Sequence, residues 1–288
     1  PLFDPTLAPG LNLAASTISR ETEHKSIAAS ISYSLTDALS ITVEGRYLEE
    51  DLDYAGNNIF RGFYTASSGT ICTIGVAYPC GNSKNSVSEN QFVPRASIDW
   101  NLNDDALLYF SYAEGFKPGG IATVDADSDV SDGEFKAETL KSYELGAKTS
   151  WLNKSVFFNG AVFFYDYTDQ QVPVSASNGA VAVSKVVNAG ESELFGAEFD
   201  VTWQVTEGFS ANLGYVYSDT EYTEYNLREI TEENLSGIAS VSNNNIAISG
   251  NEDGDFSGKQ FALSAKHAAT LSLRYERAID SGMNAIVE

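Results

Sequence analysis

The sequence of 288 residues is poor in basic side chains, cysteine and long apolar runs. Its 17 lysines and arginines stand against 40 aspartates and glutamates, which gives a formal net charge of −23. Phosphate binding needs a cationic surface, so this charge excludes nucleic acid as a partner. No apolar run approaches the roughly 20 residues of a membrane helix, and the start lacks the basic and apolar segments of a signal peptide. We therefore expect no transmembrane helix, and a leader that is either absent or upstream.

Patterns for catalysis and cofactor binding are also missing. The two histidines, His24 and His267, lie far apart in the sequence, and no Ser or Cys nucleophile motif surrounds either of them. Neither a glycine-rich phosphate loop nor a paired metal-ligand spacing occurs. Together these absences indicate that the protein is not an enzyme, and we expect no cofactor.

The acidic run at residues 125–132 is a weak candidate for a metal site. Asp125, Asp127 and Asp129 stand at alternate positions, as ligands often do in calcium loops. However, Val130 takes the place of the glycine that such a loop needs, and Lys136 the place of its bidentate glutamate. The sequence favours a solvated loop here, and we assign no metal.

The two cysteines, Cys72 and Cys80, enclose seven residues within a loop-like stretch at residues 67–86. In an oxidising compartment they can form a disulfide, which would contribute roughly 2–3 kcal/mol by closing so small a ring. The other interpretation is two unpaired thiols. No histidine or further cysteine nearby completes a metal site, so the disulfide is our prediction.

What the chain has in abundance is aromatic residues, 15 Tyr and 16 Phe, and apolar residues in period 2. In residues 39–47 the apolar side chains of Leu39, Ile41, Val43 and Tyr47 alternate with Ser40, Thr42, Glu44 and Arg46. Such alternation is typical of a strand with one apolar and one polar face. It recurs along the chain, which predicts an all-β protein with nine strands and the start of a tenth.

The connections between these strands alternate between short and long. Short ones are expected at residues 35–38, 101–105, 152–154, 204–208 and 276–282, and long ones at residues 49–91, 117–137, 168–181 and 223–260. Outer-membrane barrels have this asymmetry, with short periplasmic turns and long outer loops, whereas compact soluble domains seldom have loops of such length. We therefore predict a transmembrane antiparallel β-barrel.

Each strand that leads into a short turn ends with an aromatic residue on its apolar face: Tyr33, Trp100, Trp151, Trp203 and Tyr275. Aromatic rings prefer the boundary between membrane and water, so these five are predicted to form the periplasmic girdle. The alternative is that each caps a hydrophobic core. The charged residues of the strand centres fall in the polar phase, as a water-filled lumen requires.

Several stretches resemble TonB-dependent receptors of the outer membrane. They are residues 92–120, which contain the run GFKPGG, residues 138–171, which contain YELGAK, and residues 186–190, 195–203 and 258–276. The resemblance covers most of residues 26–276. It departs from the family at Ala265, where a proline is common.

This resemblance implies a 22-stranded barrel with an N-terminal plug inside it, of which residues 1–288 would be one partial barrel domain. The chain would hold roughly the tenth to nineteenth strands, without the plug, its TonB-contacting segment and the last strand. The implied function is TonB-driven uptake of a scarce nutrient, with a ferric siderophore favoured. The implied setting is a monomer among the lipid and lipopolysaccharide of a Gram-negative outer membrane. The alternatives are a passive porin and an extracellular adhesin or carbohydrate-binding sandwich.

The residues expected near the outer mouth are the candidates for ligand contact: Tyr64, Phe116, Lys117, Tyr222, Tyr225 and Arg228. Aromatic rings with a few cations suit a catecholate or carboxylate ligand through stacking and charge. The competing interpretation is that these rings belong to an outer aromatic girdle.

Overall fold

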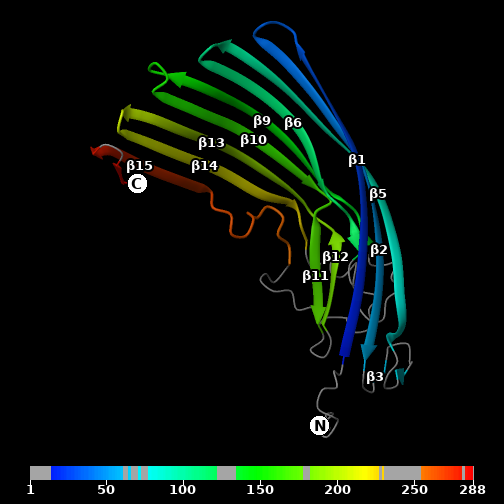
Figure 1. Ribbon diagram of the computed structural model, residues 1–288. Helices are drawn as coiled ribbons and strands as arrows, with labels where there is room; N and C mark the ends of the chain where they lie inside the picture. Colours follow the sequence, from blue (N-terminus) through cyan, green and yellow to red (C-terminus); the bar gives the residue numbers. More distant parts are fainter. Residues whose placement is uncertain are drawn as a thin grey trace.

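A computed structural model describes residues 14–60, 64–65, 71–72, 77–121, 134–177, 182–226, 229, 254–280 and 283–287. Within them, one large antiparallel sheet holds ten strands whose spatial order follows the chain (Figure 1). The strands are β1 (Ala14–Ser34), β2 (Leu39–Phe60), β5 (Ala77–Asn103), β6 (Ala106–Lys117), β9 (Glu138–Trp151), β10 (Val156–Thr168), β13 (Glu191–Thr206), β14 (Phe209–Glu224), β15 (His267–Asp280) and β16 (Met283–Val287). The predicted all-β fold and the number of strands are confirmed. No helix in the described part of the chain is long and apolar enough to cross a membrane.

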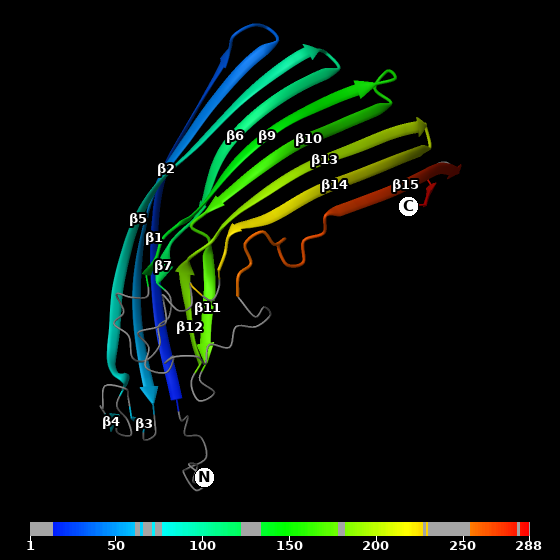
Figure 2. The same ribbon diagram turned by 180° about the vertical axis from the view of Figure 1, so that it is seen from behind.

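The sheet has two different edges, as the alternation of connections predicted. Short turns join β1 to β2, β5 to β6, β9 to β10, β13 to β14 and β15 to β16, and their ends of the strands are called the turn edge below. The opposite ends form the loop edge, from which the long connections leave (Figures 1 and 2). Three small pairs lie in those connections: β3 (Tyr64–Thr65) with β4 (Ile71–Cys72), β7 (Gly120–Ile121) with β8 (Glu134–Phe135), and β11 (Gln171–Ser177) with β12 (Ala182–Asn188).

The predicted loop at residues 49–91 is wrong in large part, because β2 and β5 continue through it as paired strands to Phe60 and from Ala77. Beyond the apolar band both faces of these strands carry polar residues, so the period-2 signal that marks a strand is lost. Packing on the face of the polar phase supports this pairing, because Leu48 and Leu52 on that face are only 3% and 4% exposed. The loop expected at residues 168–181 likewise contains strand β11.

One face of the sheet is apolar, and the other described residues leave it uncovered. Ile31 is 73% exposed, and Leu271, near the other end of the sheet, is 64% exposed. An apolar face of this extent cannot rest in water, but it matches the hydrocarbon that surrounds a membrane barrel. The polar phase of the same strands faces the opposite side, which is the lumen side of such a barrel.

Candidate functional site

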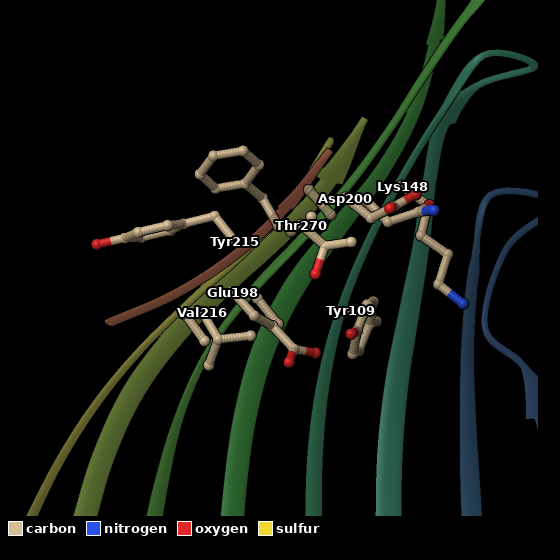
Figure 3. Close-up of a pocket in the computed structure, with 14 residues that line it drawn as sticks. Tyr109, Lys148, Glu198, Asp200, Tyr215, Val216 and Thr270 are labelled. Carbon is tan, nitrogen blue, oxygen red and sulfur yellow. The ribbon is translucent and has the colours of Figure 1, made fainter. Parts of the chain in front are cut away.

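A hollow of about 510 Å³ lies on the polar face, lined by residues of β6, β9, β10, β13, β14 and β15 (Figure 3). Tyr109, Lys148 and Glu198 project on this side, whereas Tyr215 projects on the other side of the sheet. The register agrees, because side chains alternate between the two faces along a strand. The hollow is therefore a feature of the lumen side.

Two aromatic rings lie against glycines on this polar face. The hydroxyl of Tyr109 donates to Oε1 of Glu144 at 2.6 Å, and its ring lies so close to Gly146 that an added Cβ would be 2.3 Å from it. The ring of Phe163 covers Gly196 in the same way, again at 2.3 Å from an added Cβ. Both glycines belong to the sequence runs that resemble the receptor family, and they leave room for rings that lie along the wall.

Further polar residues of this face are linked across strands β13 and β14. The amide Nδ2 of Asn212 donates to Oδ2 of Asp200 and to Oγ1 of Thr202, each at 3.0 Å. Nζ of Lys148 lies 5.7 Å from the centre of the Tyr109 ring. These contacts leave acids and hydrogen-bonding groups facing the hollow, so the surface suits a polar partner rather than lipid.

At the loop edge, two of the predicted ligand residues come together. The ring of Tyr222 lies 4.9 Å from that of Tyr225 and 4.7 Å from that of Phe261, and Tyr225 lies 5.4 Å from Phe256. The returning chain is tied to β14 here, since Phe256 N donates to the carbonyl of Tyr225 at 2.8 Å. Burial raises the pKa of Tyr225, with the neighbouring Tyr222 adding to the effect. The cluster thus joins the end of β14 to residues 256–261.

Two other predicted ligand residues, Lys117 and Phe116, lie away from this cluster. Lys117 lies on β6, four strands from β14, and its Nζ is 4.0 Å from Oε2 of Glu138. Phe116 falls in the same phase as Phe110, whose side chain belongs to the apolar face, so its position fits an outer aromatic belt better than a lumen contact. The backbone of Tyr64 pairs with that of Cys72 between β3 and β4; the side chain of Tyr64 lies outside the described part of the structure.

Several predictions lie outside the described residues: Arg228, the acidic run with Asp125, Asp127 and Asp129, and the side chains of Cys72 and Cys80. The disulfide therefore stays a prediction. Among the described residues, no group of three or more His, Cys, Asp or Glu side chains could hold a metal ion. The five proposed girdle residues, Tyr33, Trp100, Trp151, Trp203 and Tyr275, are 45–66% exposed near the turn edge, and their level in a membrane stays a prediction.

The sequence interpretation missed three polar residues at the loop edge, Glu89, Gln171 and Asn188. Each binds main-chain atoms of another connection: Glu89 accepts from Gly119 N at 2.8 Å, Gln171 donates to Pro118 O at 2.7 Å, and Asn188 donates to Lys136 O at 2.8 Å. Their only sequence signal is position: Gln171 and Asn188 are the first residue of β11 and the last of β12, and Glu89 lies within β5, near the end of the connection predicted at residues 49–91.

Comparison with known proteins places nearly the whole sheet in one family. The family described as "TonB dependent receptor-like, beta-barrel" matches residues 3–284. The pesticin receptor of Yersinia enterocolitica is 28% identical over 136 residues, which are 47% of this chain and 19% of that protein. The ferric-pyoverdine BN7/BN8 receptor of Pseudomonas putida is 29% identical over 147 residues, 49% of this chain and 17% of that protein.

The solved structure of the ferric yersiniabactin uptake receptor FyuA from Yersinia pestis has the same fold. It superimposes with a TM-score of 0.63 at 17% identity, over 93% of this chain and 34% of the receptor. The chain thus spans less than a fifth of the length of these curated relatives and about a third of this solved barrel protein.

Proposed function

Because this chain belongs to the family of TonB-dependent receptor β-barrels, we propose that the receptor of which it forms a part imports a scarce nutrient across the outer membrane. The favoured cargo is a ferric siderophore. The family consists of transport receptors of the Gram-negative outer membrane, not of enzymes. The choice of siderophore is supported by the named cargo of a relative, the ferric-pyoverdine receptor. The single observation that carries the proposal is the family match over residues 3–284.

The two faces of the sheet supply what such a receptor needs. The apolar face contacts lipid, and the polar face with its hollow turns toward the lumen, where the N-terminal plug of the full receptor would pack. Hydrocarbon does not tolerate unpaired strand edges. β1 and β16 are the edge strands of the described sheet, and the remaining barrel strands would pair with them.

At the loop edge, the cluster of Tyr222 and Tyr225 offers rings for stacking against a planar ligand such as a catecholate. Lys117 adds a cation on the polar face; its ion pair with Glu138 is long, at 4.0 Å, and the lysine side chain is 62% exposed, so the ammonium can exchange this partner for an anionic ligand. Arg228 and Tyr64 belong to the same proposed contact set. Phe116 is the weakest member, given its place on the apolar side.

The competing functions make different demands. A passive porin would need no energy from TonB, and the family membership speaks against it. A soluble adhesin or carbohydrate-binding protein of sandwich type would need a second sheet packed on the first. The described residues instead form one large sheet with an uncovered apolar face.

The deciding experiment measures growth and uptake of labelled ferric siderophores in a host carrying the full-length gene, with iron withheld and with or without functional TonB. Uptake that disappears without TonB supports the proposal. Uptake that persists without TonB would replace it with the porin. If no siderophore is taken up while another nutrient is, the transport class stands and the cargo changes.

A further inference from the structure

The β11–β12 hairpin is attached at its base to another connection. Its first pair of residues, Gln171 and Asn188, reaches across to the segments that flank the β7/β8 pair. Nε2 of Gln171 donates to the carbonyl oxygens of Pro118 at 2.7 Å and of Lys136 at 3.1 Å. One side-chain amide thus bridges both chain segments that enter and leave β7 and β8.

Asn188 binds Lys136 as a neighbouring strand would. Its Nδ2 donates to the Lys136 carbonyl at 2.8 Å, and its Oδ1 accepts from the Lys136 N–H at 2.5 Å. The same Nδ2 also donates to the carbonyl of Asp169 at 2.9 Å, just before β11. Both main-chain groups of Lys136 are therefore satisfied by one residue of the hairpin.

Glu89 of β5 holds the same two segments from the other side. Its Oε2 accepts from Gly119 N at 2.8 Å and its Oε1 from Ala137 N at 3.1 Å. Hydrogen bonds to an ionised carboxylate are about twice as strong as neutral ones. The approach is tight, because a Cβ at Gly119 would lie 2.4 Å from the Phe135 carbonyl oxygen.

The contacts of Glu89 lie beside a packed layer, whereas those between Asn188 and Lys136 are exposed. Ala137 is 7% exposed, Val187 is 5% exposed, and Ser192 is fully buried while accepting from Gln170 Nε2 at 2.7 Å. Moving one segment away from the others would break the part-buried hydrogen bonds of Glu89 and the one from Gln171 to Pro118, which costs more than breaking exposed ones.

We infer that Glu89, Gln171 and Asn188 form a clamp that makes three outer connections move as one cap: the loop-edge part of β5, the β7/β8 pair and the β11–β12 hairpin. On the proposed function, a ligand that moves any one of them moves all three, so closure over the mouth is concerted. The clamp itself is a property of the fold and can be tested without a ligand.

Hydrogen exchange followed by mass spectrometry on the full-length receptor in lipid nanodiscs measures this coupling. Among the described residues, no hydrogen bond joins Glu89 to β11 or β12, so Glu89→Ala is the informative variant. A concerted cap predicts exchange roughly tenfold faster in Gln171–Ser177 and Ala182–Asn188, as expected when charge-assisted hydrogen bonds that stabilise the closed form are lost. Faster exchange confined to Gly119 and Ala137 would overturn the inference.

The reciprocal variant protects the test from a simple folding defect. Asn188→Ala should speed exchange of the Gly119 amide, which Glu89 and not Asn188 holds; an unchanged Gly119 amide would count against the clamp. The matched control is Glu49→Ala, a carboxylate paired with Asn90 beside Glu89 but in the opposite phase, and it should leave the cap unchanged. Far-ultraviolet circular dichroism verifies that each variant retains its sheet.

Discussion

Tyr109 on β6 lies directly opposite Gly146 on the adjacent strand β9, and its ring fits there because glycine has no side chain. Tyr109 pairs with Gly146 across the strands, and its ring occupies the space where any other residue would place a Cβ. The hydroxyl at the end of that ring is then held by Glu144 at 2.6 Å. The glycine thus fixes how the tyrosine lies along the wall, and the glutamate fixes where its hydroxyl points.

Gly146→Ala is expected to destabilise the barrel, because the new Cβ would lie 2.3–2.5 Å from atoms of the Tyr109 ring. Overpacking of this kind costs about 1–3 kcal/mol. Urea unfolding of the refolded full-length receptor measures the loss. Tyr109→Ala in the same chain should recover most of it, as a double-mutant cycle would show.

Gly214→Ala is the matched control for that variant. Gly214 also lies in the polar phase, but a Cβ there would meet only Asp200 Oδ2, at 3.9 Å. Its substitution should leave the free energy of unfolding nearly unchanged. Equal losses at both glycines would mean that backbone freedom, not the Tyr109 ring, sets the need for glycine.

Leu213→Arg should impair insertion, because Leu213 is 40% exposed on the apolar face of β14. An arginine near the middle of the lipid-facing band costs about 2–4 kcal/mol. The control is Thr270→Arg, because Thr270 lines the hollow on the polar face. The ratio of inserted to soluble protein after folding into vesicles reports the difference. Equal yields from the two variants would contradict the assignment of the faces.

The girdle prediction can be measured by tryptophan fluorescence. In full-length receptors that retain only Trp100, Trp151 or Trp203, lipids brominated near the headgroup should quench each emission more strongly than lipids brominated at the chain end. The three residues should also give similar depths. Widely different depths would contradict the girdle prediction and show that the three rings are placed independently.

The ion pair between Asp219 and Lys266 predicts an acid sensitivity beyond the apolar part of β14. The Lys266 ammonium, 2.9 Å away, holds the pKa of the Asp219 carboxyl below its ordinary value of 3.8, so the stabilising pair is complete above about pH 4. It is lost as the pH falls through the lowered pKa. Next to it, Ser218 N donates to the Lys266 carbonyl at 3.0 Å.

Exchange of the Ser218 amide, compared at each pH with Asp219→Asn, tests this dependence. The wild type should exchange more slowly than the variant at neutral pH, and the two rates should converge in acid. A difference that stays constant down to the most acidic condition would show that the pair does not hold this segment.

The sequence predicts the sheet well wherever the two faces differ in polarity. Residues around Leu39 and Val43 alternate between lipid and lumen, and their strand was predicted correctly. From Glu49 onward both faces carry polar residues, so the same strand continues without a sequence signal. The period-2 alternation arises because one face contacts lipid, so it ends where the apolar band ends.

The site was less predictable, because its contacts join residues far apart in the chain. Tyr222 and Tyr225 were found through their type and their place near a strand end. Their partners Phe256 and Phe261 follow a long connection, and only the return of the chain along β14 brings them close. Gln171 and Asn188 bind main-chain atoms, and such contacts impose no side-chain pattern on their partners.

That last property has an evolutionary consequence. Because Gln171 and Asn188 hold carbonyl and N–H groups at Pro118 and Lys136, the side chains at the attachment points are free to change. Phages, bacteriocins and antibodies that recognise an outer loop select for altered side chains. A cap held through main-chain contacts can change its exposed side chains and keep its fold.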